Sequence, residues 1–431
     1  MANAINISSY RHILRNRTFA CADNMQFQHV RELHHRLGPL AIGAGYHPTV
    51  KPFRRAHPGW NSDHELLRES VRGFVERELT PNVETWEALG EFPRELYRKA
   101  GEHGLLGLGF PEEFGGTPTD NFGKLLVAEE VCRAGSGGLV AGLMSHGIGL
   151  PPILALGSAT LKAKVAPGVI AGERISALAI TEPGGGSDVA NLQTRARREG
   201  DHYIVDGSKT FITSGMRADW ITTAVRTGDA GMNGISLLVI PGDAPGLSRS
   251  KLDKMGWWCS DTASLYFDGC KVPAENLIGM ENGGFMGIMV NFNGERMMLA
   301  AMALAFARLC FEEALAWARE RRTFGKALLG HQVVRHKLVD MATSIRAVEC
   351  VVDDLAWRLD RGEVPIADVC MAKNLATQCV ELCAKEAVQI LGGGGYIRGC
   401  KSERIYRETK VLAIGGGAEE IMKELAARQM F

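Results

Sequence analysis

Strand-like sequence interrupts an otherwise helical chain over residues 174–284, and this change of period constrains the fold most strongly. Before it, apolar residues recur at helical spacing from about residue 62 to 171; Asp63 is the expected first N-cap, and Pro81 stops the first helix. Within it, short apolar runs end at Gly, Asp or Pro turns at 220–225, 235–240 and 263–267. Helical spacing resumes at roughly 286–320, 328–360, 366–391 and 402–429. The pattern predicts a compact β-domain between two helical parts.

A glycine-rich loop lies near the start of the strand-like region. A short expected strand, 178–180, runs into Thr181, Pro183 and the three glycines 184–186, followed by Ser187. Such a turn exposes backbone N–H groups beside two hydroxyls, which suits a polar, anionic cofactor. From these residues alone, an ordinary solvent loop is an equally good interpretation.

A hairpin is expected shortly after this loop. Two apolar runs, 203–205 and 210–213, flank Asp206-Gly207, a pair typical of a two-residue type I′ turn. The sequence therefore predicts a chain reversal at Asp206-Gly207.

These two linked segments, Thr181–Asp188 and Gly207–Thr213, resemble the signature of the acyl-CoA dehydrogenase family. The resemblance implies a multidomain α+β fold, with an N-terminal helical domain, a small β-barrel-like domain and a C-terminal four-helix bundle. The expected boundaries are a basic extension at 1–58, then domains at 59–173, 174–284 and 285–431. The resemblance does not extend into the first of these segments.

The resemblance also implies an activity. It is the α,β-dehydrogenation of an acyl-CoA thioester by an FAD-dependent homotetramer that passes electrons to an electron-transfer flavoprotein. The isovaleryl-CoA and long-chain types are the most similar, so a branched, medium-chain or long-chain acyl group is expected. No Gly-x-Gly-x-x-Gly pattern occurs, so a Rossmann-type nucleotide site is unsupported.

The resemblance divides the expected flavin contacts into two groups. One contains the glycine-rich loop and the predicted hairpin, where Phe211 is expected to stack beside the flavin ring. The other resembles a pyrophosphate-binding corner at the end of a helix and is expected to reach the flavin of a neighbouring subunit. Taken alone, the Arg321-Arg322 pair is equally typical of a side-chain cap that complements a helix dipole. The full expected set is Leu178, Ile180, Thr181, Gly186, Ser187, Phe211, Ile212, Thr213, Arg321, Thr323, Phe324, Gln332, Gln389, Gly392, Gly393 and Glu420.

A thioester dehydrogenase needs a base for the α-proton, and most of the family carries a Glu in the C-terminal loop. Here Gly416 stands at that position, while Glu419 and Glu420 look like the polar start of a helix. Glu295 is the expected base, because its helical neighbours at i+4, i+7 and i+11 are apolar: Leu299, Met302 and Phe306. A salt bridge to another helix is the alternative. Isovaleryl-CoA and long-chain relatives support the base, since they carry it on this helix and have Gly at the loop position.

Substrate contacts are expected at three positions. By resemblance, Arg296 contacts CoA or the active-site wall, Ser187 contacts the pantetheine, and Gly416 lies beside the acyl group. Asn293 replaces a common family Asp just before this segment, which weakens the expected CoA contact.

Composition limits the remaining possibilities. The formal net charge is +0, which gives no global attraction to nucleic acid, and no apolar run is long enough to span a membrane. The 10 cysteines include no Cys-x-x-Cys pair, so no metal is expected, and Cys379 with Cys383 is expected to pack in a core. These features predict a soluble protein of a bacterial cytoplasm or, as a second choice, of a mitochondrial matrix. The Arg-rich residues 1–58 are interpreted as a loose extension or an upstream start, with a transit peptide as the alternative.

Two other functions stay open from the sequence. One is a relative with altered chemistry, such as an acyl-CoA oxidase that uses O₂. The other is a DNA-associated flavoprotein of the same fold, although the basic N-terminal residues lack an interleaved aromatic, base-stacking pattern.

Overall fold

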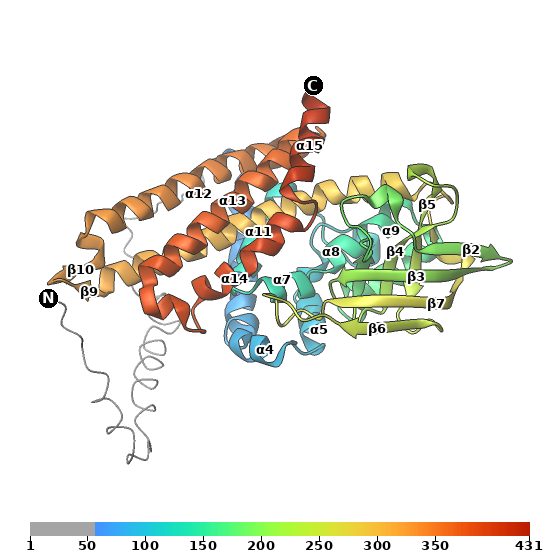
Figure 1. The fold of residues 1–431 in the computed structure, drawn as a ribbon, viewed down its shortest axis with the longest axis horizontal. Coiled ribbons are helices and arrows are strands. Elements are labelled where there is room, and N and C mark those ends of the chain that lie inside the picture. Colours follow the sequence, from blue (N-terminus) through green and yellow to red (C-terminus); the bar gives the residue numbers. More distant parts are fainter. Residues whose placement is uncertain (1–56) are drawn as a thin grey trace, which may run out of the picture. The chain divides into compact units, whose positions relative to one another are not determined.

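The computed structural model describes residues 57–431, apart from the side chain of Val290 (Figure 1). Residues 1–56 lie outside the described residues, and with them nearly all of the predicted basic extension.

Helices form the first part of the described chain. They are α3 Ser62–Phe74, η2 Val75–Leu79, α4 Val83–Leu89, α5 Glu95–Glu102, η3 Leu105–Gly107, η4 Glu112–Phe114, α6 Asn121–Cys132, α7 Gly137–Leu143, α8 His146–Gly149, α9 Pro151–Leu156 and α10 Ala159–Ile170. The prediction of Asp63 as the first N-cap is wrong. The side chain of Asn61 accepts hydrogen bonds from the backbone N–H groups of Asp63 and His64, and the His64 ring accepts one from Asn61. This reciprocal capping box fixes the start of α3 at Ser62, about two and a half turns before its first buried apolar residue, Val71.

The middle part is an eight-stranded sheet with the strand order β6-β7-β3-β2-β4-β5-β8, and β1 pairs in parallel with β4. The strands are β1 Ser176–Ala179, β2 Arg195–Glu199, β3 His202–Ile212, β4 Trp220–Arg226, β5 Ile235–Pro241, β6 Leu247–Lys251, β7 Ala263–Pro273 and β8 Leu277–Ile278, with single 3-10 turns η5 Val189–Asn191, η6 Met232–Gly234 and η7 Ala274–Asn276. The three strand runs found in the sequence at 220–225, 235–240 and 263–267 are β4, β5 and the start of β7.

The predicted chain reversal at Asp206-Gly207 is wrong. β3 runs straight through both residues, and its pairing with β7 shifts register between Val205 and Gly207. Gly207 has φ +140°, and a β-carbon there would lie 2.7 Å from the Cα of Thr194, so this glycine serves a bulge and a close backbone approach. The reversal lies earlier, at residues 200–201 between β2 and β3, where Gly200 has φ +61°.

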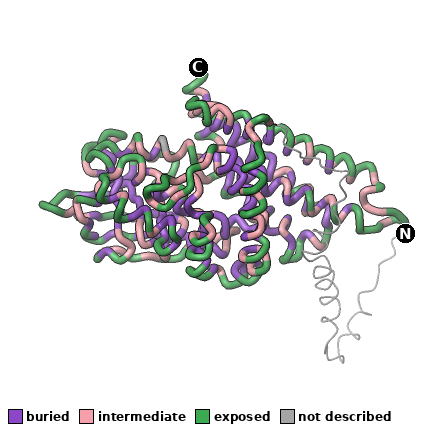
Figure 2. Tube along the Cα trace, turned by 180° about the vertical axis from the view of Figure 1, so that it is seen from behind, coloured by how far each residue is buried: buried purple, intermediate pink, exposed green. Residues whose placement is uncertain are grey.

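The last part is helical again. It contains α11 Gly284–Glu320, β9 Arg322–Thr323, β10 Lys326–Ala327, η8 Leu328–Gly330, α12 Gln332–Leu359, α13 Ile366–Leu391, η9 Gly392–Tyr396, α14 Lys401–Ile414 and α15 Glu419–Met430. The predicted helical segment at 402–429 is therefore two helices, separated by residues 415–418, which we call the terminal loop. The 37-residue α11 packs against α12, α13 and α14, and also against α6 of the N-terminal part. The sides of these helices that face one another are buried, whereas the outer sides are exposed (Figure 2).

One apolar cluster joins the start of α11 to the β-domain. Ile180, at the entry to the glycine-rich loop, and Ile288, in the second turn of α11, are both buried in it. Leu178 and Phe292 pack against the same cluster, so the predicted cofactor loop and the predicted catalytic helix share a core. Among residues 57–431 no single helix is long and apolar enough to cross a membrane. The bent pair formed by α7 and the segment His146–Leu156 meets the length and composition for a span only when the two are taken together.

Candidate active site

Glu295, from the first third of α11, lies against the terminal loop. A β-carbon placed on Gly416 would lie 3.7 Å from Glu295 Oε1 and 2.5 Å from Leu299 Cδ1. Gly416 also has φ +63°, a backbone conformation that favours glycine. The structure thus brings together Glu295, the expected base, and Gly416, the glycine at the position where most of the family carries its base.

The carboxyl group of Glu295 is in an environment that disfavours its charge. Burial raises its pKa from 4.5 to about 7, and the positive charges of Arg296 and Lys373 only partly oppose this shift. Its Oε2 atom is shielded from solvent and has no hydrogen-bond partner among residues 57–431. A buried, unpartnered carboxylate oxygen is uncommon in a purely structural role, and it is suited to receive a proton.

Arg296 faces the protein interior. Its side chain is 4% exposed, its Nε donates to the Gly416 carbonyl oxygen at 3.1 Å, and its Nη1 donates to Asn293 Oδ1 at 2.9 Å. The guanidinium lies 5.7 Å from the centroid of the Phe292 ring. Arg296 therefore braces the terminal loop from the α11 side, and its expected contact with CoA stays a prediction.

Lys373 of α13 is a member of this site that the sequence analysis missed. Its ammonium group is fully buried and donates to the carbonyl oxygens of Ala413 at 3.0 Å and Gly417 at 2.8 Å. A signal was present in the sequence, since Lys373 is a lone cation on a stripe whose other members, Val369, Ala376 and Val380, are apolar. Sequence alone does not say which loop that stripe faces.

The glycine-rich loop is held by a buried ion pair. Lys209 of β3 donates from Nζ to the Ile180 carbonyl oxygen at 2.9 Å and to Glu182 Oε1 at 2.8 Å. The two Glu182 oxygens also accept from the backbone N–H groups of Gln193 at 2.6 Å and Thr194 at 2.8 Å. These bonds fix Ile180 and Glu182, which lie just before the first glycine of the loop, Gly184.

The loop and β3 together offer a surface that fits a flat ring. The Thr210 N–H donates to the Thr181 carbonyl oxygen at 2.9 Å, which places Phe211 next to the loop. Phe211 has φ +61° and is 69% exposed. A strained backbone and an exposed aromatic ring both cost free energy, and a ligand bound against the ring would offset that cost. β-carbons on Gly184 and Gly185 would have no neighbour within 4 Å, so this backbone is free to approach a ligand. The residues present therefore fit a flavin ring with a polar edge.

Other predicted members of this group differ in accessibility. Gly186 and Ser187 are exposed, whereas Leu178 is partly buried against the shared core and Thr213 is partly buried. The side chain of Ile212 is 2% exposed, so any contact with a cofactor there is through its backbone.

The second predicted group lies at the other end of the bundle (Figure 1). Phe324 has φ +50° and is 95% exposed, and the neighbouring Arg321 is exposed as well. At 1.5 Å per residue, α11 separates Arg321 from Glu295 by about 39 Å. Also exposed at this end are Gln332, Gln389, Gly392 and Gly393, and Thr323 is partly buried beside them. Within one chain this group is therefore not brought to Glu295.

Glu420 lies near the terminal loop instead. It is exposed in the first turn of α15, while the neighbouring Glu419 accepts a hydrogen bond from Thr377 Oγ1 at 3.0 Å.

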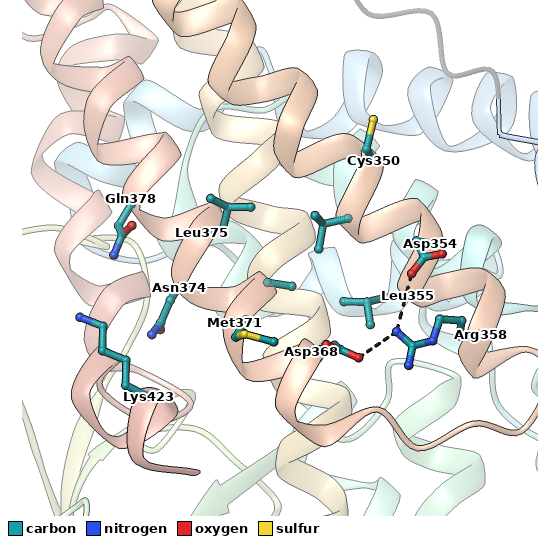
Figure 3. Close-up of a pocket in the computed structure, with 12 residues that line it drawn as sticks. Cys350, Asp354, Leu355, Arg358, Asp368, Met371, Asn374, Leu375, Gln378 and Lys423 are labelled. Carbon is teal, nitrogen blue, oxygen red and sulfur yellow. Dashed lines mark hydrogen bonds and ion pairs between the residues drawn. The ribbon is translucent and has the colours of Figure 1, made fainter. Parts of the chain in front are cut away.

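A groove of about 700 Å³ lies on α12, α13 and α15 (Figure 3). Its lining includes the ion pair between Arg358 and Asp368, and none of the predicted site residues. No group of three or more His, Cys, Asp or Glu side chains that could hold a metal occurs among the described residues. Cys379 and Cys383 are buried in α13.

Three family models match successive parts of the chain. The acyl-CoA dehydrogenase N-terminal domain matches residues 61–173, the middle domain matches residues 177–270, and the C-terminal domain matches residues 282–431. These ranges follow the observed order of helices, sheet and helices, and they bear out the predicted fold class.

Individual relatives cover nearly the same part of the chain. The acyl-CoA dehydrogenase AFT10-1 of Alternaria alternata is 39% identical over 89% of this chain and 95% of its own. The mitochondrial long-chain specific acyl-CoA dehydrogenase of Rattus norvegicus is 36% identical over 86% of this chain and 87% of its own.

Solved structures agree with these relatives. A probable acyl-CoA dehydrogenase from Mycobacterium abscessus superposes with a TM-score of 0.85 at 49% identity, over 86% of this chain and 99% of its own. A glutaryl-CoA dehydrogenase from Mycobacterium smegmatis in complex with FADH2 gives a TM-score of 0.82 at 26% identity, over 86% and 95% of the two chains. The chain therefore belongs to the acyl-CoA dehydrogenase family of oxidoreductases.

Proposed function

We propose that this protein is an FAD-dependent acyl-CoA dehydrogenase in which Glu295 removes the α-proton of the thioester. One observation carries the proposal: the Glu295 carboxyl group, with its pKa raised to about 7, lies against the glycine at position 416. A base on α11 needs an unobstructed loop opposite it, and a side chain at 416 would strike Leu299.

The glycine-rich loop, Thr181 and Phe211 would hold the flavin ring, and the exposed backbone of Gly184 to Gly186 would meet its polar edge. When bound, FAD supplies the acceptor for the hydride that leaves the β-carbon. Glu295 Oε2, which has no partner within the chain, takes the α-proton, so that the α-carbon keeps the electron pair that becomes the new double bond. The apolar neighbours of Glu295 keep bulk water from competing for that proton.

The rate of the reaction should depend on pH through Glu295. Burial raises the pKa of this group to about 7, so its proton is held more tightly and the free base is lost as the pH falls. We expect kcat/KM to fall by about tenfold per pH unit below about pH 7, whereas a solvated Glu would stay active to about pH 5. Stopped-flow flavin reduction across this range measures the profile, and a rate that is constant down to pH 5 contradicts the assignment.

The two groups of predicted flavin contacts support an oligomer with shared sites. A flavin that lies beside Glu295 is far from the exposed Arg321 and Phe324 of the same chain, because about 39 Å of α11 separates them. The exposed, positive-φ Phe324 is suited to cover a ligand that another subunit holds. We infer that a second copy of the chain supplies Arg321 and Phe324, within a homotetramer or a dimer of dimers.

Subunit complementation tests this arrangement. Glu295→Gln and Arg321→Ala chains, each inactive or weak alone, are expressed together with two different tags. A mixed oligomer would contain one intact site, formed by Glu295 of one chain and Arg321 of the other, so activity should appear in the doubly tagged fraction. Doubly tagged oligomers that are no more active than the parents would refute a shared site.

The substrate is proposed to be a branched, medium-chain or long-chain acyl-CoA, with an electron-transfer flavoprotein as the acceptor. Anaerobic titration of the yellow protein with short, branched and long acyl-CoAs is expected to bleach the flavin with at least one of them. Slow reoxidation in air fits a dehydrogenase, and rapid reoxidation identifies an oxidase instead. No bleaching with any thioester, together with salt-dependent DNA binding, would favour the DNA-associated alternative.

A further inference from the structure

Two buried cations, one from α11 and one from α13, hold the terminal loop and the end of α14. Lys373 of α13 donates to the carbonyl oxygens of Ala413 and Gly417, and Arg296 of α11 donates to that of Gly416. Both side chains are at most 4% exposed. Three carbonyl groups in five consecutive residues are therefore bound by charged donors.

The position of Lys373 follows from the end of α14. The last carbonyl groups of a helix have no partner within it and carry a partial negative charge. Ala413 lies in the last turn of α14, and the glycines that follow provide no side chain to cap it. The ammonium group of Lys373 supplies both the missing donors and the complementary charge.

Keeping a lysine here carries a cost, which argues that it has a specific use. Burial lowers the pKa of Lys373 to about 8, and the charge of Glu419 partly opposes that shift. A methionine would fill the same volume without the cost of desolvating an ammonium group. Packing alone therefore does not account for a lysine at this position.

We propose that Lys373 is a positioning residue of the active site, whose ammonium group holds the terminal loop so that Gly416 stays against the carboxyl group of Glu295. The inference rests on the proposed role of Glu295 as the base. Lys373 bonds to the residues on both sides of Gly416, at 413 and 417, so it fixes the loop on which the spacing between 416 and 295 depends.

The same charge acts on the base through space. The charged and titratable groups that face Lys373 are Arg296 and Glu295 from α11, Cys370 from its own helix and Glu419 from α15. Arg296 and Lys373 both favour the ionised form of Glu295. Removal of the Lys373 charge should therefore shift the pH profile of the reaction to higher pH.

The test compares Lys373→Met with Lys385→Met in the FAD-loaded, full-length protein. Lys385 lies on the same helix, and its side chain is 70% exposed, so it controls for the substitution itself. In Lys373→Met we expect faster hydrogen–deuterium exchange at 413–418, a kcat lower by roughly 10- to 100-fold with a smaller change in KM, and a profile displaced to higher pH. Lys385→Met should match the wild type in all three measurements.

Lys373→Gln is the second variant, because it removes the charge but keeps a hydrogen-bond donor. It should move the pH profile as Lys373→Met does, with a smaller change in hydrogen–deuterium exchange at 413–418. It replaces Lys373→Met in the test if the methionine variant does not fold. Unchanged exchange and an unchanged profile in the variant that folds would overturn the proposal. Faster exchange with unaltered kinetics would also overturn it, because the loop would then not matter to the base. If the wild type itself fails to react with any acyl-CoA, the proposed function fails, whereas the exchange measurement still decides whether Lys373 holds the loop.

Discussion

Glu295→Gln is expected to slow flavin reduction by an acyl-CoA by roughly 10²- to 10⁴-fold, the range that a general base contributes. Glutamine keeps the size of the side chain but cannot accept the α-proton. Because the substitution removes a carboxylate whose Oε2 atom is buried without a partner, the protein should fold, bind FAD and be at least as stable as the wild type above pH 7. Anaerobic stopped-flow absorbance of the flavin measures the rate.

Two matched substitutions control for this result. Glu320→Gln changes an exposed residue at the far end of α11, and Glu420→Gln changes the exposed carboxylate next to the terminal loop. Glu320→Gln should react at the wild-type rate, and Glu420→Gln should keep the pH profile of the base. Full-speed reduction by Glu295→Gln, or a larger loss in Glu420→Gln, would show that the base is elsewhere.

Lys209→Met is expected to destabilise the protein by about 3–5 kcal/mol, because it leaves a buried carboxylate without its partner. Lys209 is fully buried and Glu182 is 7% exposed, so solvent does not replace the lost charge. Burial alone would raise the pKa of Glu182, and the charge of Lys209 reverses this effect and lowers it. The glycine-rich loop should loosen, and the variant should retain less FAD after gel filtration. Chemical denaturation followed by fluorescence measures the free energy of unfolding.

The charge explanation has its own control. Adding Glu182→Gln to Lys209→Met removes the stranded charge but keeps an oxygen for one of the two backbone donors, so part of the stability should return. Lys271→Met, on the exposed side of β7, should change stability by less than about 0.5 kcal/mol. If Lys209→Met unfolds like this surface variant, the ion pair does not hold the loop.

The proximity of Glu295 and Gly416 could be predicted from the sequence because each position was unusual for its setting. The carboxylate on an apolar stripe is a local pattern, whereas the glycine at the family's usual base position was recognised through the resemblance. A chain with its base on α11, as proposed, would change both, so the two departures point to one site.

The pairing of β3 with β2 and β7 was harder to predict, because the residues Asp206-Gly207 are compatible with both a turn and a β-bulge. Asp206-Gly207 is a strong hairpin signal, yet Gly207 is needed for a bulge that passes close to Thr194. The strand that pairs there, β2, has the sequence Arg-Ala-Arg-Arg-Glu and is mostly exposed. Such a polar strand gives no apolar alternation, so tertiary pairing with β3 and β4 rather than local propensity determines its place in the sheet.

Lys373 was missed for a different reason. The helix that carries it and the loop that it binds are 40 or more residues apart, and only packing shows which face of α13 meets the terminal loop. The residues around Arg321, at the far end of α11, were found by resemblance, but within one chain they lie far from Glu295. Sequence periodicity gives the faces of helices, whereas their partners depend on the assembled fold.

The most direct measurement is a crystal structure of the FAD-loaded protein with a 3-thia acyl-CoA, whose sulfur at the β-position prevents hydride transfer. The account predicts a Glu295 carboxylate oxygen about 3–3.5 Å from the α-carbon, on the side opposite the flavin ring. An α-carbon that lies beyond the reach of Glu295, with another carboxylate nearer to it, would contradict the account.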